Sequence, residues 1–332
     1  MAVKSAFSIR DEGEWWPGLS VRTLSFRTVD MQEGHATAAR SAIGRAVSAD
    51  LQAVDVCFIP FWECIGSAFP QPPEFNLGTT VRDFVEGVGK GQDAPVSPGV
   101  RPRILFACNT THTCFVRPNG FVFVNGECVR KPRLVRGLDE DEWQPLAGPH
   151  TAFVLEAACP ACRVFNFCDH ECVDSALPTW AISGPRILGA DGYHRPPFRP
   201  RPGFSVPGAL PAGPTRNDEV NYHPGKTCTS FTAFGVTSNR RVICVSMFEK
   251  PRDAQFALPL GINVPEMAEL LQLLGAVEGI IGGGAADTQQ FLRGAAPEFL
   301  EAPTRARRPE EGRRLEVSGP RGLGAILALL AR

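Results

Sequence analysis

The sequence predicts an α+β protein in which a mixed or antiparallel sheet is covered by packed helices. Two kinds of apolar spacing support this prediction. Residues 114–128 alternate around short turn sequences, and two apolar segments, 231–237 and 242–248, flank the turn at 238–240; both patterns are typical of antiparallel hairpins. Residues 264–274 repeat apolar side chains at intervals of three and four, which is typical of a helix with one buried face. With 332 residues and 43% hydrophobic content, the chain can bury a large core.

The first hundred residues mix strand and helix signals. Residues 22–29 alternate as a strand does, and the apolar run 54–61 predicts a buried strand. Residues 36–47 are rich in alanine, so we expect a helix there. Residues 66–102 carry many prolines and glycines and predict loops around a short helix at 81–88. We therefore assign residues 1–50 to an N-terminal extension packed on a core domain of residues 51–300.

The middle and the end of the chain contain further strands and two irregular segments. Residues 103–108 and 151–155 are short apolar runs that predict strands. The proline-rich segment 193–225 predicts a long loop, and long ordered loops are often functional. Residues 301–332 are first charged and then apolar, which predicts a linker followed by a C-terminal helix at 323–330.

The clearest helix begins at a capping box. Asn263 can accept from the amide of Glu266, while the Glu266 carboxylate can reach back to the amide of Asn263. Pro265 lies in the first turn, where its missing N–H costs nothing, and Gly275 is a natural left-handed stop. We therefore assign Glu266 to the helix cap and not to catalysis.

Three consecutive glycines, Gly282, Gly283 and Gly284, follow the apolar strand predicted at 277–281. Glycine loses more backbone entropy on folding than any other residue, so the run indicates a structural need. Bare backbone amides facing a ligand would explain it, and so would a tight turn or bulge. A polar cluster stands just after the glycines: Asp287, Thr288, Gln289 and Gln290.

Two cysteine pairs lie close together in a segment at 158–173. Cys159 and Cys162 are separated by five residues from Cys168 and Cys172, and His170 lies within the second pair. Thiolates and imidazole suit a structural zinc ion, although ordinary zinc ribbons and fingers space their pairs by roughly 12 to 20 residues. A redox pair or disulfide and unligated buried thiols are the alternatives. No cofactor is required by the sequence.

Composition excludes several classes of partner. The 34 basic and 35 acidic residues nearly balance, which does not favour nucleic-acid binding. No apolar run is long enough for a transmembrane helix, and the first residues lack the apolar core of a signal peptide, so we expect a cytoplasmic setting. The common esterase, nucleotide-binding and metalloprotease motifs are absent from the sequence. The sequence does not predict an oligomeric state.

Four segments in the same order resemble the phosphodiester glycosidase domain family over roughly residues 100–295. The helix and glycine stretch is similar to the family's pattern, and residues 231–237 are similar to its strand R-T-A-I-G-V-T. Residues 181–185 with Asp191 and Gly192 are similar to its segment a-i-s-G-g-p…dG, and Asn109 matches the asparagine of N-G-g-F. Members of this family are typically exported. The resemblance implies that the fold is phosphodiester glycosidase-like and that the ligand is a glycosyl phosphate.

The chain departs from the family at two charged positions. Phe231 stands where the family has an arginine, and no aspartate precedes the three glycines. Asp287 follows them instead. Either the acid has moved to the other side of the glycines, or this domain has lost the chemistry.

Cleavage of a sugar–phosphate diester needs a proton-transfer or charge-stabilising group, donors for the phosphate and a site that orients the sugar. Asp287 is the candidate carboxylate, with a loop-capping role as its alternative. His112 and His223 are candidates for proton transfer, and Arg186 and Lys226 for phosphate binding. The remaining candidate substrate-binding residues are Asn109, Ser183, Gly184, Thr232, Gly282, Gly283, Gly284, Thr288 and Gln289.

The predicted function is therefore hydrolysis of a sugar-1-phosphate diester or a related glycosyl phosphate. The alternative is a non-catalytic descendant that binds a glycosyl phosphate or nucleotide, or serves as an interaction module. The missing family aspartate and arginine favour the alternative, whereas the retained glycines and polar residues favour ligand binding.

Overall fold

The computed structural model describes the greater part of the chain. The described ranges are 6–32, 35–60, 80–89, 103–110, 113–114, 117–118, 121–130, 148–156, 158–168, 171–184, 186–193, 230–249, 261–284, 288–294, 297–302, 305–306, 317–318 and 325–332.

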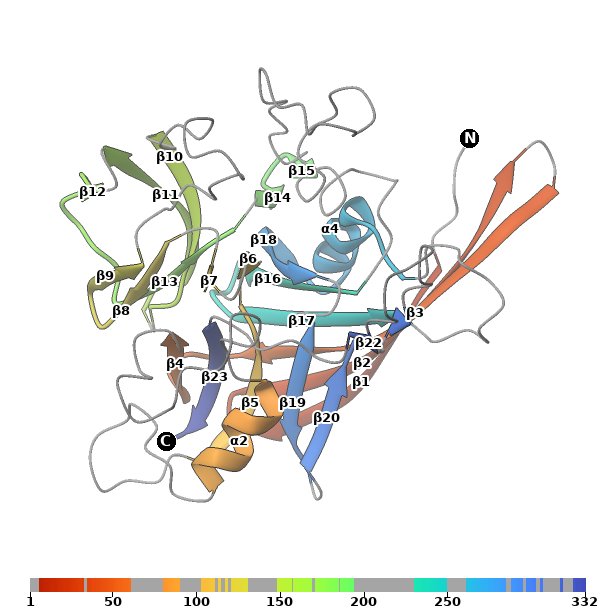
Figure 1. Ribbon diagram of the computed structural model, residues 1–332, viewed down its shortest axis with the longest axis horizontal. Coiled ribbons are helices and arrows are strands. Elements are labelled where there is room, and N and C mark those ends of the chain that lie inside the picture. Colours follow the sequence, from red (N-terminus) through yellow and green to blue (C-terminus); the bar gives the residue numbers. More distant parts are fainter. Residues whose placement is uncertain are drawn as a thin grey trace, which may run out of the picture.

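An eight-stranded sheet runs through the centre of the molecule (Figure 1). Its strands, in spatial order, are β1 (Ala6–Trp16), β2 (Leu19–Gln32), β3 (His35–Ala49), β17 (Val242–Glu249), β16 (Phe231–Thr237), β18 (Ala276–Gly284), β14 (Arg186–Gly189) and β15 (Gly192–Tyr193).

Two further sheets and two short ribbons complete the strands. The five-stranded sheet has the order β20 (Pro297–Glu301), β19 (Gln289–Arg293), β5 (Ile104–Asn109), β23 (Ala325–Ala331) and β4 (Val54–Pro60). The six-stranded sheet has the order β12 (Glu171–Cys172), β11 (Ala161–Cys168), β10 (Gly148–Val154), β13 (Trp180–Ser183), β8 (Val122–Val124) and β9 (Glu127–Arg130). The ribbons are β6 (Thr113–Cys114) with β7 (Arg117–Pro118), and β21 (Arg305–Ala306) with β22 (Val317–Ser318).

The strand pairs given by the structure are antiparallel, and the helices of the described residues are α2 (Val81–Gly89) and α4 (Val264–Leu273). The protein is thus mainly antiparallel β, and the prediction of an α+β protein built with packed helices is wrong. Among the described residues, no helix is long and apolar enough to cross a membrane.

The sheets and helices stack in layers because their apolar faces pack against one another. One face of the eight-stranded sheet packs under α4 through a core that includes Leu24, Val245, Met267 and Leu271. The opposite face packs on the five-stranded sheet, and also receives side chains from the six-stranded sheet. Helix α2 covers the outer face of the five-stranded sheet. Figure 1 shows the resulting order, with α4 above the eight-stranded sheet and the five-stranded sheet with α2 below it.

The segment 36–47 is a strand, so the helix predicted there is wrong. Within β3, Arg40, Ala42 and Ala46 are buried on the α4 side, whereas Ile43 between them is 45% exposed. Strand β3 pairs with β2 on one side and with β17 on the other. Alanine is the best helix former, but helix propensity contributes little free energy per residue, so two ladders of hydrogen bonds and a half-buried face override it.

The C-terminal helix predicted at 323–330 is also wrong, because β23 lies inside the five-stranded sheet between β5 and β4. Leu327 and Leu329 contribute to the core between the sheets, and Ala328 packs toward α2. Since both faces of this strand are buried, its sequence is a continuous apolar run, which by periodicity alone cannot be distinguished from a short helix.

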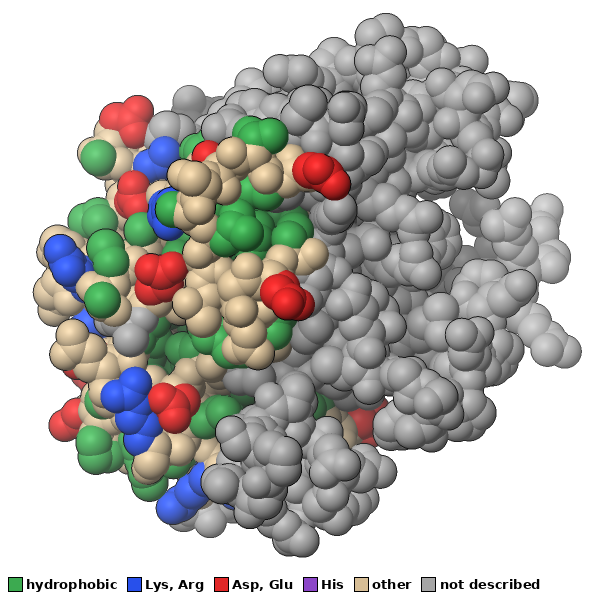
Figure 2. Space-filling view, turned by 90° about the vertical axis from the view of Figure 1, so that its left-hand side faces the viewer, with side chains coloured by type: hydrophobic (Ala, Val, Ile, Leu, Met, Phe, Trp, Pro, Cys, Tyr) green, Lys and Arg blue, Asp and Glu red, His purple; other side chains and the backbone are tan. Residues whose placement is uncertain are grey.

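Other predicted elements are confirmed. The helix at 264–274 corresponds to α4, the short helix at 81–88 corresponds to α2, and the hairpin at 231–248 corresponds to β16 and β17. The face of the molecule in Figure 2 carries basic and acidic side chains interspersed among apolar ones over its described part, in keeping with the balanced composition.

Candidate functional site

Polar side chains gather between the eight-stranded and five-stranded sheets, where β5 ends and β16 and β19 begin. We call this group the polar junction. Its members are fully or almost fully buried, apart from Arg45 on β3, whose side chain is 13% exposed. The polar junction consists of Arg45, Asn109, Thr232, Ser246, Thr288 and Gln290.

Asn109 joins the two sheets. This residue ends the buried strand β5, and its Oδ1 accepts from Thr232 Oγ1 at 2.6 Å and from the Gln289 backbone N–H at 3.1 Å. Thr232 Oγ1 also lies 3.1 Å from Ser246 Oγ on the neighbouring strand. Both hydrogen bonds use the amide oxygen, and the Nδ2 donor of Asn109 is buried without a hydrogen-bond partner.

The polar junction contains buried polar atoms that lack partners. Within the described part of the chain, the buried side-chain atoms without a hydrogen bond are Asn109 Nδ2, Thr288 Oγ1, Gln290 Oε1, and Nε and Nη1 of Arg45. A buried polar group left unpaired costs about 1–3 kcal/mol, so such groups are rare and usually meet a ligand or an ordered water. Their concentration at one place marks the polar junction as the candidate site.

The three glycines form the end of β18 and do not form an open turn. Gly282, Gly283 and Gly284 are buried. A Cβ at Gly282 would lie 2.5 Å from the Thr110 carbonyl oxygen, and one at Gly284 would lie 2.9 Å from the Phe231 ring. The glycine-rich loop is therefore not supported. Glycine at 282 instead allows β18 to approach the end of β5 beside Asn109.

Several predicted residues lie elsewhere or have a structural role. Arg186 ion-pairs with Glu278 at 3.2 Å, and its Nε donates to the Leu188 carbonyl. Ser183 Oγ accepts from the Phe121 amide at 2.9 Å, which satisfies strand pairing next to Gly184. Gln289 contributes its backbone to Asn109, while its Oε1 accepts from the Val81 amide at the start of α2.

Other predicted residues are outside what the structure describes. Asp287, His112, His223 and Lys226 lie outside the described residues. Asn109, Thr232 and Thr288 are the predicted substrate-binding side chains that the fold brings together, with Gly282 beside them.

The predicted cysteine pairs lie toward opposite ends of β11. In the strand register, Cys162 lies near the start of β11, opposite Phe153 of β10. Cys172 of β12 lies opposite Phe167, near the end of β11. At about 3.4 Å per residue, the strand separates positions 162 and 167 by roughly 17 Å, too far for one tetrahedral site. Cys159 is exposed, and the Cys168 side chain lies outside the described part. No group of three or more metal-ligating residues occurs among the described residues.

Burial raises the pKa of two cysteine thiols, those of Cys162 and Cys108. Burial raises the pKa of the Cys162 thiol to about 12, with the Glu278 carboxylate adding to the rise and Arg186 opposing it. Burial also holds the pKa of the Cys108 thiol well above its usual range, and its contact with Cys244 acts in the same direction. Both thiols are protonated near neutral pH, so neither is a ready nucleophile.

Arg45, Ser246 and Gln290 were not predicted as site residues. Arg45 stood in a segment expected to be helical, and Ser246 in a strand expected to serve only the sheet. Gln290 belongs to the polar cluster after the glycines, in which the sequence predicts Thr288 and Gln289 as substrate-binding residues. For Gln290, the signal in the sequence is the alternation of side chains along a strand. In β19, residues 290 and 292 share the face toward the eight-stranded sheet.

Comparison with known proteins shows a distantly related fold. No protein-family model and no curated protein matches the sequence. The fold is similar to the catalytic domain of zebrafish N-acetylglucosamine-1-phosphodiester alpha-N-acetylglucosaminidase, auto-inhibited by its pro-peptide, with a TM-score of 0.52 and 15% identity over 99% of this chain and 89% of that chain. That neighbour supports the expected phosphodiester glycosidase resemblance as a distant relationship of fold.

Two other solved structures are less similar. A hypothetical protein from Synechocystis has a TM-score of 0.47 and 12% identity over 98% of this chain and 64% of that chain. A protein of Burkholderia pseudomallei assigned as exported has a TM-score of 0.46 and 11% identity over 99% of this chain and 96% of that chain.

Proposed function

We propose that the chain is a glycosidase-type hydrolase that cleaves a sugar-1-phosphate diester, and that the polar junction binds this substrate. The observation that carries the proposal is the set of unpaired buried atoms on Asn109 and Thr288 beside Gly282. The likeness of the fold to a phosphodiester glycosidase catalytic domain supports the reaction class.

The atoms of the polar junction suit an oxygen-rich ligand. Asn109 Nδ2 is a donor, and Thr288 Oγ1 can donate or accept, so both can bind phosphate or sugar oxygens. Because the two side chains are fully buried, their hydrogen bonds to substrate would be stronger than in water. These groups would orient the diester and stabilise charge on the departing phosphate.

Asp287 is the carboxylate that we assign to the reaction. Covalent geometry alone keeps its Cα about 3.8 Å from that of Thr288, whose unpaired hydroxyl is part of the polar junction. A carboxylate there would stabilise the oxocarbenium-like transition state or accept a proton from water. His112 follows the buried residue Thr110 by two positions, and we assign it the proton transfer to the leaving group, with His223 as the alternative.

A binding protein without catalysis is the second candidate. Among the described residues, the carboxylate in direct contact with the polar junction is that of Glu298. This carboxylate already forms an ion pair with Arg45. The family's aspartate before the glycines is also absent from the sequence. Both observations favour ligand binding with no turnover.

Incubation with N-acetylglucosamine-1-phosphodiesters and nucleotide sugars, with release of free sugar as the readout, separates the two candidates. The wild-type chain should release sugar from at least one substrate, and Asp287→Asn should lower kcat by about 10²-fold or more. Asp55→Asn makes the same change at an exposed position that pairs with Arg332, and it should leave kcat unchanged. Saturable substrate binding without sugar release would support the binding protein and refute the hydrolase.

A further inference from the structure

A row of polar side chains crosses the eight-stranded sheet on the face toward the five-stranded sheet. In the strand register, Thr232 on β16 is opposite Ser246 on β17, and Ser246 is opposite Arg45 on β3. Neighbouring strands lie about 4.8 Å apart, so Arg45 is roughly 10 Å from Thr232 along this row. The polar junction therefore has a second end, away from Asn109 and the glycines.

Gln290 and Glu298 of the five-stranded sheet hold Arg45 in place. Gln290 Nε2 donates to the Arg45 carbonyl oxygen at 3.3 Å, and the Glu298 carboxylate ion-pairs with Arg45 Nη2. These contacts leave Arg45 Nε and Nη1 as buried donors and Gln290 Oε1 as a buried acceptor, without partners among the described residues. Gln290 is only 1% exposed.

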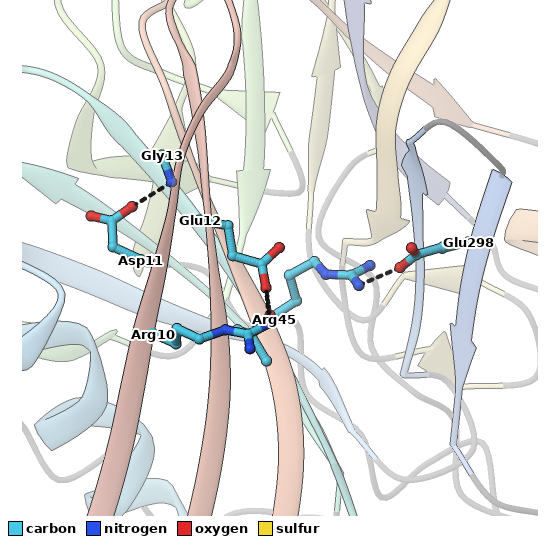
Figure 3. Close-up of polar contacts among 7 residues, drawn as sticks. Arg10, Asp11, Glu12, Gly13, Arg45 and Glu298 are labelled. Atoms are coloured by element: carbon cyan, nitrogen blue, oxygen red, sulfur yellow. Dashed lines mark hydrogen bonds and ion pairs between the residues drawn. The ribbon is translucent and has the colours of Figure 1, made fainter.

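The charge around Arg45 is balanced. Figure 3 shows Arg45 between Glu12 and Glu298, with a dashed line to Glu298. Glu12 accepts a hydrogen bond from Thr23 Oγ1. The pKa of the Glu12 carboxyl group is lowered mainly by the hydrogen bonds from Thr23 and Arg10, and the charge of Arg45 lowers it further. An incoming phosphate would meet two guanidiniums, those of Arg10 and Arg45, and the two carboxylates that pair with them, so its attraction to this end is largely cancelled.

The unpaired atoms at this end match a hydroxyl group better than an ionised anion. A fully ionised phosphate only accepts hydrogen bonds, so it would leave Gln290 Oε1 unpaired. A sugar hydroxyl both donates and accepts. Two neighbouring hydroxyls can therefore accept from Arg45 and donate to Gln290 together.

We propose that Arg45 and Gln290 form a subsite for the neutral, hydroxylated sugar ring of the ligand, about 10 Å from the Asn109 end of the polar junction. This assignment deepens the proposed function and rests on it for the class of ligand. It places the sugar over β3 and β19 and leaves the phosphate near Asn109 and Thr288.

Binding of free N-acetylglucosamine and of inorganic phosphate, titrated separately by protein-observed NMR, tests the subsite. Arg45→Lys keeps the charge next to Glu298 but removes the planar donor pair, and Gln290→Leu removes the acceptor. Each variant should weaken sugar binding more than tenfold and leave phosphate binding within twofold. Arg82→Lys changes a comparable arginine–glutamate pair with Glu301 of the same sheet and should change neither affinity.

Thermal unfolding of each variant shows whether the fold is retained. If Gln290→Leu does not fold, Arg45→Lys alone tests the subsite. An unchanged sugar affinity in Arg45→Lys would overturn the subsite. The same holds if the wild-type chain binds no sugar, which would mean that the unpaired atoms bind only water. Phosphate binding that is lost in Arg45→Lys would also overturn it. Sugar binding that depends on Arg45 without any hydrolysis would instead refute only the proposed catalysis.

Discussion

Cys162 illustrates how burial decides the chemistry of a single residue. Its backbone N–H donates to Glu278 Oε2 at 3.1 Å, and this same carboxylate pairs with Arg186. The thiol is partly buried and lies next to a negative charge, and both conditions disfavour the thiolate. Cys159, three residues earlier in the chain, is exposed.

We predict that iodoacetamide alkylates Cys159 much faster than Cys162. Only the thiolate reacts, and with a pKa of about 12 the thiolate fraction of Cys162 at pH 8 is about a thousandfold lower than for a thiol at 9.0. Because the pKa is raised, the rate for Cys162 should keep rising with pH up to about 12, whereas that of an ordinary thiol levels off above pH 9.0. Peptide mapping by mass spectrometry measures both rates, and equal rates at pH 8 would contradict the assignment.

At the scale of the element, α4 is held by a buried ion pair as well as by its apolar stripe. Arg40 of β3 binds Glu266 through two hydrogen bonds of 2.7 and 2.9 Å, and the two side chains are only 6% and 8% exposed. Glu266 also accepts from the Asn263 amide at 2.8 Å, so one carboxylate both caps the helix and fastens it to the sheet.

Glu266→Gln should lower the free energy of unfolding by about 3–5 kcal/mol, because Gln can still cap the helix but removes the negative charge that balances Arg40 in the interior. Asn263→Ala removes only the cap and should cost about 1 kcal/mol. Urea unfolding measures both. The double variant Arg40→Met/Glu266→Gln should recover part of the loss, and no recovery would show that the ion pair is not the cause.

At the scale of the whole molecule, the two ends of the described chain are parts of the sheets. Strand β3 pairs with β17 from Ala42 to Ala49, and β23 lies between β5 and β4. Leu327 and Leu329 are fully buried and belong to the core between the two sheets, which the polar junction interrupts.

Leu327→Asp should abolish the cooperative thermal transition, since it places a carboxylate without a partner in that core. Arg332→Ala alters an exposed residue that pairs with Asp55 and should change the free energy of unfolding by less than about 1 kcal/mol. Near-UV circular dichroism during heating follows the transition. A native-like transition in Leu327→Asp would mean that β23 is not part of the core.

The elements that could be predicted from the sequence are those whose signals are local. The capping box at Asn263 and Glu266, the stop at Gly275 and the turn between β16 and β17 involve residues close together in the chain. The position of Asn109 at the end of a buried strand is also local. These signals do not require any knowledge of which strands pair.

By itself, the sequence determined where α4, α2 and the strands of several hairpins lie. It also indicated Asn109 at the end of a strand and Thr288 in the polar cluster after the glycines, while Thr232 came from the resemblance to the family. Only the tertiary structure decided that residues 36–47 and 325–331 are strands, because pairing on both sides outweighs weak local preferences. It also decided that Arg45 and Gln290, 245 positions apart, meet at one end of the polar junction. The physical reason is that strand register is set by contacts distant in sequence, and register determines which side chains share a face.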